Sequence, residues 1–198
     1  MLSNDKPMIP LDSCYFLTLN TVDKIDVFTR PAYKQVIADA LNFFVQAQGL
    51  TVYSWCLMTS HLHLIVRTKK ATDPAYFERD FKKYTTPAIL KTIEMEMDFR
   101  REWMMRHFEE YRKSLQRTEK FHLWQDCSSP LRIDVSTPRA LLDRIAHIHE
   151  NPVRERIVEQ PEAYLFSSAR DYTGRPGLVR VRVVQQQGPF GIKMLSSN

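Results

Sequence analysis

Two β-prone segments joined by only two residues constrain the fold of this chain more than any other feature. Residues 51–58 are rich in β-branched and aromatic side chains, and an apolar run follows at residues 61–66. Thr59 and Ser60 leave room only for a tight turn between them. The two segments are therefore predicted to pair as an antiparallel hairpin.

The second strand of this hairpin carries two histidines. Side chains alternate along a strand, so His61 and His63 are expected on one face of the sheet. Two imidazoles placed in this way can bind a metal ion, although an isolated His-x-His pattern is more often two ordinary residues of a half-exposed strand. The pattern alone leaves both interpretations open.

The remaining elements follow from apolar periodicity and from proline and glycine signals. They are a strand at 14–20, a helix at 31–48, helices at 74–84 and 87–118 separated at Thr85–Pro87, short strands at 121–125 and 131–135, a helix at 138–151 and a basic-faced strand at 179–183. Strand, helix, hairpin, helix and strand is the order of a ferredoxin-like (βαββαβ) α+β fold. We expect an antiparallel sheet with helices packed on one face and the histidine strand at its centre.

A chain of 198 residues fits one domain. Residues 1–12 are expected to be a flexible leader, residues 13–184 to form the domain, and residues 185–198 to be a mobile tail. No apolar run approaches the roughly 20 residues of a membrane span, and the three cysteines are too widely spaced for a disulfide framework. The expected location is the cytoplasm, with no membrane contact.

The charge balance allows anionic partners without identifying one. The net charge is +5, and basic residues recur along the predicted helices. Lys82, Lys83, Arg100 and Arg101 could line a face that tracks phosphates, but interspersed glutamates make an ordinary solvated face an equally good interpretation.

A third metal ligand could come from the helix at 138–151. His147 and Asn151 are four residues apart and share a face of that helix. Asn151 could equally be the residue that ends the helix before Pro152.

Five short motifs together resemble one family. The segment Met58–Val66 resembles the His-hydrophobic-His motif of single-tyrosine HUH transposases, particularly those associated with repetitive extragenic palindromes. Further similar segments occur in the family's order and extend the resemblance over about residues 14–184: Phe81–Thr85, Trp124–Gln125, His147–Arg154 and Ser167–Tyr172.

The resemblance implies a protein that binds single-stranded or hairpin DNA and cuts the strand beside the hairpin. In that family a tyrosine attacks the scissile phosphate, and a divalent metal, Mg²⁺ or Mn²⁺, polarises it. His61, His63 and Asn151 match the metal ligands. The residues expected to contact DNA are Lys82, Lys83, Arg100, Arg101 and Arg154.

The chain departs from the family at the nucleophile, because His147 occupies the position of the catalytic tyrosine. One explanation is a catalytically inactive, domesticated protein that only binds hairpin DNA. Others are a different use of His147, as metal ligand, general base or nucleophile, or a substitute such as Tyr84, Tyr164 or Tyr172. In some relatives the tyrosine helix works across a dimer interface, so a homodimer is also considered, as is an RNA-binding domain.

Overall fold

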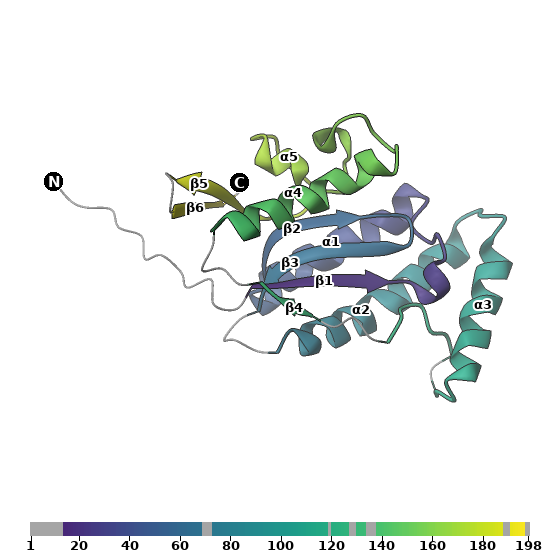
Figure 1. Cartoon of the computed structure of the whole chain (residues 1–198). Helices are drawn as coiled ribbons and strands as arrows, with labels where there is room; N and C mark the ends of the chain where they lie inside the picture. Colours follow the sequence, from purple (N-terminus) through teal and green to yellow (C-terminus); the bar gives the residue numbers. More distant parts are fainter. Residues whose placement is uncertain are drawn as a thin grey trace.

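A four-stranded antiparallel sheet organises this computed structural model, which describes residues 14–68, 73–118, 120–126, 130–133, 138–187 and 191–196 (Figure 1). The strands lie in the order β2-β3-β1-β4. Their bounds are Cys14–Asn20 for β1, Thr51–Leu57 for β2, His61–Arg67 for β3 and Leu131–Arg132 for β4. β2 and β3 form the predicted hairpin, and β3 lies between β2 and β1.

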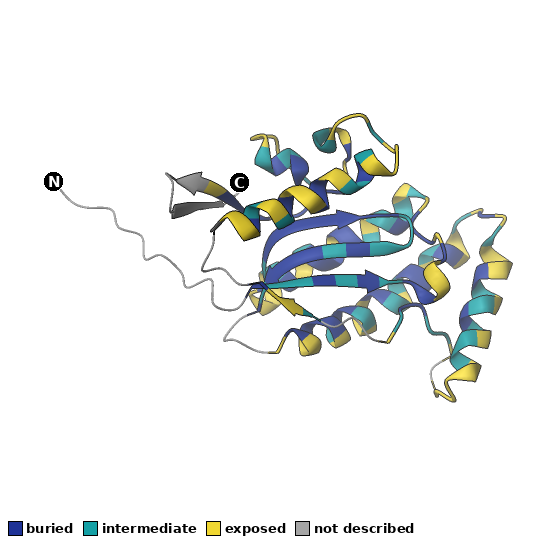
Figure 2. Ribbon diagram, viewed as in Figure 1, coloured by how far each residue is buried: buried dark blue, intermediate teal, exposed yellow. Residues whose placement is uncertain are grey.

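One face of the sheet is covered by α1 (Pro31–Gln48) and α2 (Pro74–Met95), which lie behind it in Figure 1. Leu17 and Leu64 are fully buried on this side, and the dark blue of Figure 2 follows the sheet and the inner sides of the helices. Pro31 begins α1, and Gly49 ends it with a left-handed φ of 68°. These are the signals that predicted the helix.

The opposite face is partly covered by a C-terminal layer over β2. It contains α4 (Pro138–Arg154), the 3₁₀ turn η3 (Pro161–Ala163), α5 (Ala169–Tyr172) and the hairpin of β5 (Arg182–Gln187) and β6 (Gly191–Ser196). Helices therefore lie on both faces, whereas the sequence predicts them on one. The reason is the amphipathic pattern of α4, which buries Leu141, Ile145 and Ile148.

α2 continues through Pro87, so the predicted break at residues 85–87 is wrong. The hydroxyls of Thr85 and Thr86 donate to the carbonyls of Phe81 and Lys82, and the indole of Trp124 donates to Thr85. A buried stripe also runs unbroken past the proline. It consists of Phe77, Phe81, Thr85, Ile89 and Ile93. Packing of this stripe outweighs the local cost of a proline inside a helix.

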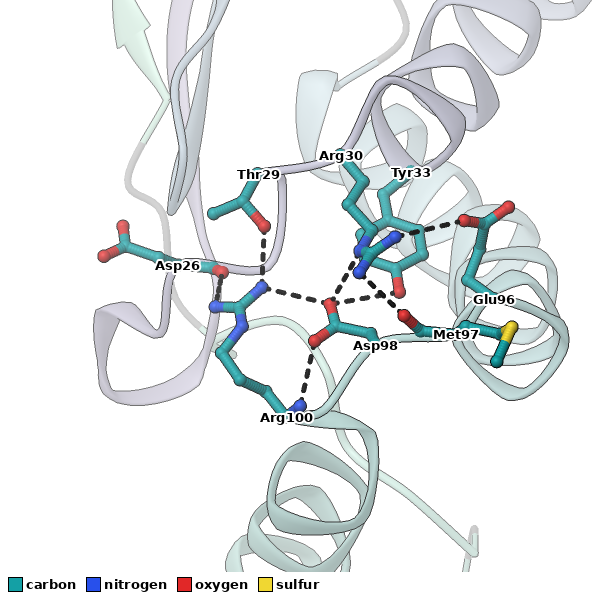
Figure 3. A network of polar contacts seen from close by, with 8 residues as sticks. All are labelled: Asp26, Thr29, Arg30, Tyr33, Glu96, Met97, Asp98 and Arg100. Atoms are coloured by element: carbon teal, nitrogen blue, oxygen red, sulfur yellow. Dashed lines mark hydrogen bonds and ion pairs between the residues drawn. The ribbon is translucent and has the colours of Figure 1, made fainter.

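The helical segment breaks instead at residues 96–100, before α3 (Arg101–Ser114) (Figure 3). Asp98 is buried there and accepts hydrogen bonds from Arg30, Tyr33 and the backbone N–H of Arg100. Burial alone would raise the pKa of Asp98, but the hydrogen bonds and charges of Arg100 and Arg30 hold it below its ordinary value. This network joins the corner between α2 and α3 to the start of α1.

Other segments depart from the sequence-based expectations. Residues 121–125 form only an isolated bridge between Trp124 and Thr21, not a strand. Residues 185–187 and 191–196, expected in a mobile tail, belong to β5 and β6, while the predicted leader at 1–12 lies outside the described residues. Within the described ranges, no helix is long and apolar enough to cross a membrane.

Candidate functional site

His61 and His63 lie side by side on the face of β3 that is turned away from α1 and α2. Their ring centroids are 4.6 Å apart, with the rings inclined at 75°. Ser54 of β2 lies on the same face and contacts His149 of α4, which shows that α4 covers the β2 edge of this face. The strip over β3 and β1 is left half-exposed.

Each histidine ring has one nitrogen engaged by a hydroxyl. Nδ1 of His63 lies 2.9 Å from Oγ1 of Thr18, its neighbour on β1, and Nδ1 of His61 lies 3.2 Å from Oγ of Ser60. Phe16 stacks on His63, with centroids 5.7 Å apart and planes 18° from parallel. These contacts orient both rings and leave each Nε2 without a hydrogen-bond partner among the described residues.

Both imidazoles are neutral at physiological pH. Burial, together with smaller effects of the neighbouring His61 and His147, lowers the pKa of His63 to about 3. Burial also lowers the pKa of His61, although the charge of Glu155 partly opposes that shift. A neutral imidazole offers the lone pair that a metal ion requires.

α4 packs mainly over β2 and also contacts β3. His147 lies close enough to lower the pKa of His63, and Glu155 close enough to act on His61. Asn151 follows His147 by one turn on the same side of α4. Its role as a ligand beside the histidine pair stays a prediction.

The side chain of Asn151 also has a structural role. Its amide nitrogen donates to the carbonyl of Ile148 at 3.3 Å. Pro152 lacks the N–H that would normally bond to this carbonyl, so Asn151 supplies the missing donor and α4 continues to Arg154 rather than ending at residue 151. The amide oxygen of Asn151 is then the atom free to act as a ligand.

His147 is exposed and lies against Arg154. The terminal nitrogens of Arg154 are 3.4 Å from Nε2 and 3.1 Å from Nδ1 of His147. A neutral imidazole has only one acceptor nitrogen, so at most one of these contacts is a hydrogen bond. Burial lowers the pKa of His147, and so do the charges of Arg154 and Arg144.

The donor set fits a divalent transition metal. Two imidazole nitrogens and one amide oxygen suit Mn²⁺ better than Mg²⁺, which prefers oxygen ligands alone. In the part of the chain that the structure describes, no three His, Cys, Asp or Glu side chains come together. His147 in its observed position therefore does not form a three-histidine cluster with His61 and His63. An amide as the third ligand stays a prediction.

None of the three substitute tyrosines contacts the histidine pair. Tyr84 is on α2, where it stacks on Phe43 behind the sheet at a centroid distance of 4.7 Å. The hydroxyl of Tyr164 donates to the carbonyl of Leu57, and that of Tyr172 donates to the carbonyl of Tyr53. Burial raises the pKa of both buried phenols, which makes them poor nucleophiles.

The predicted DNA-contacting residues are distributed over three parts of the fold. The Lys82 ammonium is paired with Glu78 and also donates to the carbonyl of Gln125, and Arg100 belongs to the Asp98 network. Lys83 and Arg101 are exposed on α2 and at the start of α3. Arg154 is the member of the set that lies on α4, against the ring of His147. DNA contact by these residues stays a prediction.

Three residues at the site were not predicted from the sequence. Thr18 and Phe16 lie on β1 and reach the histidines only because β1 pairs with β3. Arg144 of α4 lies over the ring of Phe16, with Cζ 5.0 Å from its centroid. Strand alternation places Phe16 and Thr18 on one face. The pairing of β1 with β3, which brings them to His63, is determined by the tertiary structure and not by a local pattern.

The fold and the site together define an α+β protein with an antiparallel sheet and a pair of neutral histidines beside an amphipathic helix. A solved structure of a REP-associated tyrosine transposase bound to a REP hairpin is similar in fold. The similarity has a TM-score of 0.57 at 16% sequence identity and covers 83% of this chain and 81% of that chain. No family model and no curated protein matches the sequence.

Proposed function

We propose that this protein binds hairpin or single-stranded DNA on the sheet face that carries His61 and His63. The observation that carries the proposal is the fold similarity, over most of both chains, to a transposase bound to a DNA hairpin. The strand order β2-β3-β1-β4 supports assigning a ferredoxin-like fold with the histidine motif on a central strand. The half-exposed strip between α4 and β1 offers a surface for the DNA strand.

We further propose that His61, His63 and Asn151 hold a divalent ion, Mn²⁺ or Mg²⁺. Such an ion would polarise a phosphodiester oxygen. Thr18 and Ser60 would fix the orientation of the two rings, as hydrogen-bonded neighbours of metal-binding histidines commonly do.

The proposed activity is DNA binding without tyrosine-mediated strand transfer. None of the described tyrosines forms a hydrogen bond or ring contact with His61 or His63, and His147 occupies the helix position beside them. A second candidate is metal-dependent nicking in which His147 acts as base or nucleophile. The observation favouring it is that His147 is exposed and that its pKa is lowered, so its imidazole is unprotonated at neutral pH.

Binding assays with three DNA molecules of equal length test the proposal. A hairpin with a single-stranded flank is expected to bind more tightly than a fully paired duplex, and an unstructured strand serves as the third probe. Incubation with Mn²⁺ followed by a denaturing gel separates the two candidates, because binding without cleavage or adduct supports the inactive protein. Equal affinity for the hairpin and the duplex would overturn hairpin recognition.

A further inference from the structure

Two arginines on α4 flank His147 without a carboxylate partner among the described residues. Arg144 precedes His147 by one turn, and Arg154 follows it at the end of the helix. Arg139 on the same helix pairs with Asp143 at 3.8 Å, and Arg100 pairs with Asp98 at 3.3 Å. Two guanidinium groups without carboxylate partners beside one site favour an anionic ligand there.

Arg144 is held in place by an aromatic ring. Its guanidinium lies over Phe16, which in turn stacks on His63. A cation above an aromatic face is attracted to the ring while its N–H groups stay free for a ligand. Phe16 thus keeps the charge of Arg144 on the half-exposed strip of the sheet, next to the histidine pair.

Arg154 is fixed by a different neighbour, the ring of His147, at 3.1 and 3.4 Å. Arg144 and Arg154 are ten residues apart on α4, but the guanidinium of Arg154 lies back against the ring of His147, which follows Arg144 by one turn. The two guanidinium groups are held by different neighbours, Phe16 and His147. Two separately held guanidinium groups can contact two phosphates of one strand.

We propose that Arg144 and Arg154 form a phosphate-binding row along α4 that contacts the backbone of one DNA strand on either side of His147. Phe16 acts in this row as the positioning residue for Arg144. The inference rests on the proposed DNA binding and adds the path of the bound DNA strand. This DNA strand follows α4 over the strip of the sheet that carries His61 and His63.

Salt-dependent binding of the full-length protein to the flanked hairpin tests the row. Arg144→Gln is expected to weaken binding about tenfold and to reduce the slope of log K against log salt by about 0.7 to 0.9, as for the loss of one phosphate contact. Phe16→Leu keeps the charge, so it should weaken binding while leaving that slope unchanged. Circular dichroism melts check that each variant is folded.

Arg139→Gln is the matched control, because it removes the same charge from the same helix at a side chain that is 91% exposed. It is expected to leave both the affinity and the salt slope unchanged. Equal losses in the Arg144 and Arg139 variants, or no loss in the Arg144 variant, would overturn the row while leaving hairpin binding intact.

A second probe separates this inference from the proposed function. The dinucleotide TpT carries one phosphodiester, and its titration should shift the side-chain Nε–Hε NMR signals of Arg144 and Arg154 but not that of Arg139. If the hairpin fails to bind yet TpT shifts these signals, the phosphate row stands and hairpin recognition is wrong. If neither probe affects Arg144, the row is wrong as well.

Discussion

The side-chain amide of Asn151 donates at 3.3 Å to the carbonyl of Ile148, the group that Pro152 leaves without its usual backbone donor. One side chain thereby allows the helix to continue, and its amide oxygen has no hydrogen-bond partner among the described residues. The structural role and the proposed ligand role of Asn151 are therefore compatible, since they use different atoms of the same amide.

Replacement of Asn151 by alanine is expected to lower the free energy of unfolding by about 1 kcal/mol, because the Ile148 carbonyl loses its donor. Pro152→Ala restores a backbone N–H to that carbonyl. The cost of Asn151→Ala should therefore be smaller in the Pro152→Ala background. Urea denaturation of the four proteins in this cycle measures the coupling, and simple additivity would contradict the structural role.

Thr18→Val is expected to weaken Mn²⁺ binding about tenfold, since it removes the hydroxyl beside Nδ1 of His63 with little change in shape. Calorimetric titration of Mn²⁺ in the absence of DNA provides the measurement. Thr173→Val is the control, because its hydroxyl donates to the Arg170 carbonyl at the exposed end of α5. Unchanged affinity in the Thr18 variant would show that this contact does not orient a metal ligand.

His147→Tyr tests whether His147 stands at the position of a nucleophile. The new phenol would extend from an exposed site of α4 close to His63, so with Mn²⁺ and the flanked hairpin it should create or raise formation of a covalent protein–DNA adduct. A denaturing gel detects the adduct. His147→Phe supplies the ring without the hydroxyl and should form none. A folded, DNA-binding tyrosine variant without adduct would count against the alignment of His147 with the nucleophile.

Asp98→Ala is expected to destabilise the protein by about 3 kcal/mol, because it leaves Arg30 and Arg100 without their buried partner (Figure 3). Thermal melting compares it with Glu109→Gln, which removes an exposed ion pair with Lys113 and should lower the melting temperature much less. Similar melting temperatures for the two variants would be inconsistent with a network that determines the corner between α2 and α3.

The protein is expected to become less stable as the pH is lowered, because of His149, which is buried between Ser54 and Ser168. Burial lowers its pKa to about 4, whereas the unfolded chain binds the proton near 6.5. Between these values the unfolded state binds more protons, so each pH unit of acidification lowers the free energy of unfolding by up to about 1.4 kcal/mol. Urea denaturation from pH 7 to 4.5 should show a shallower decline in the free energy of unfolding for His149→Gln than for the unchanged protein. Parallel declines in the two proteins would show that His149 does not cause the pH dependence.

The elements predicted correctly are those with strong local signals. Alternation and a short connection predicted the β2–β3 hairpin, and Pro31 together with Gly49 predicted α1. The α2–α3 region was predicted wrongly because Pro87 is a local breaker, whereas Asp98 ends the helical segment through partners distant in the sequence. A buried carboxylate with two arginines is not visible as a pattern along the chain.

Within the candidate site, the sequence alone determined that His61 and His63 share a face and that His147 and Asn151 share a side of their helix, because backbone periodicity dictates both. Only the tertiary structure decided that β1 supplies Thr18 and Phe16, that α4 packs over β2 and contacts β3, and that Lys82 and Arg100 are committed to structural contacts. Strand pairing and helix docking depend on burial summed over many distant residues, so no local pattern reveals which side chains meet.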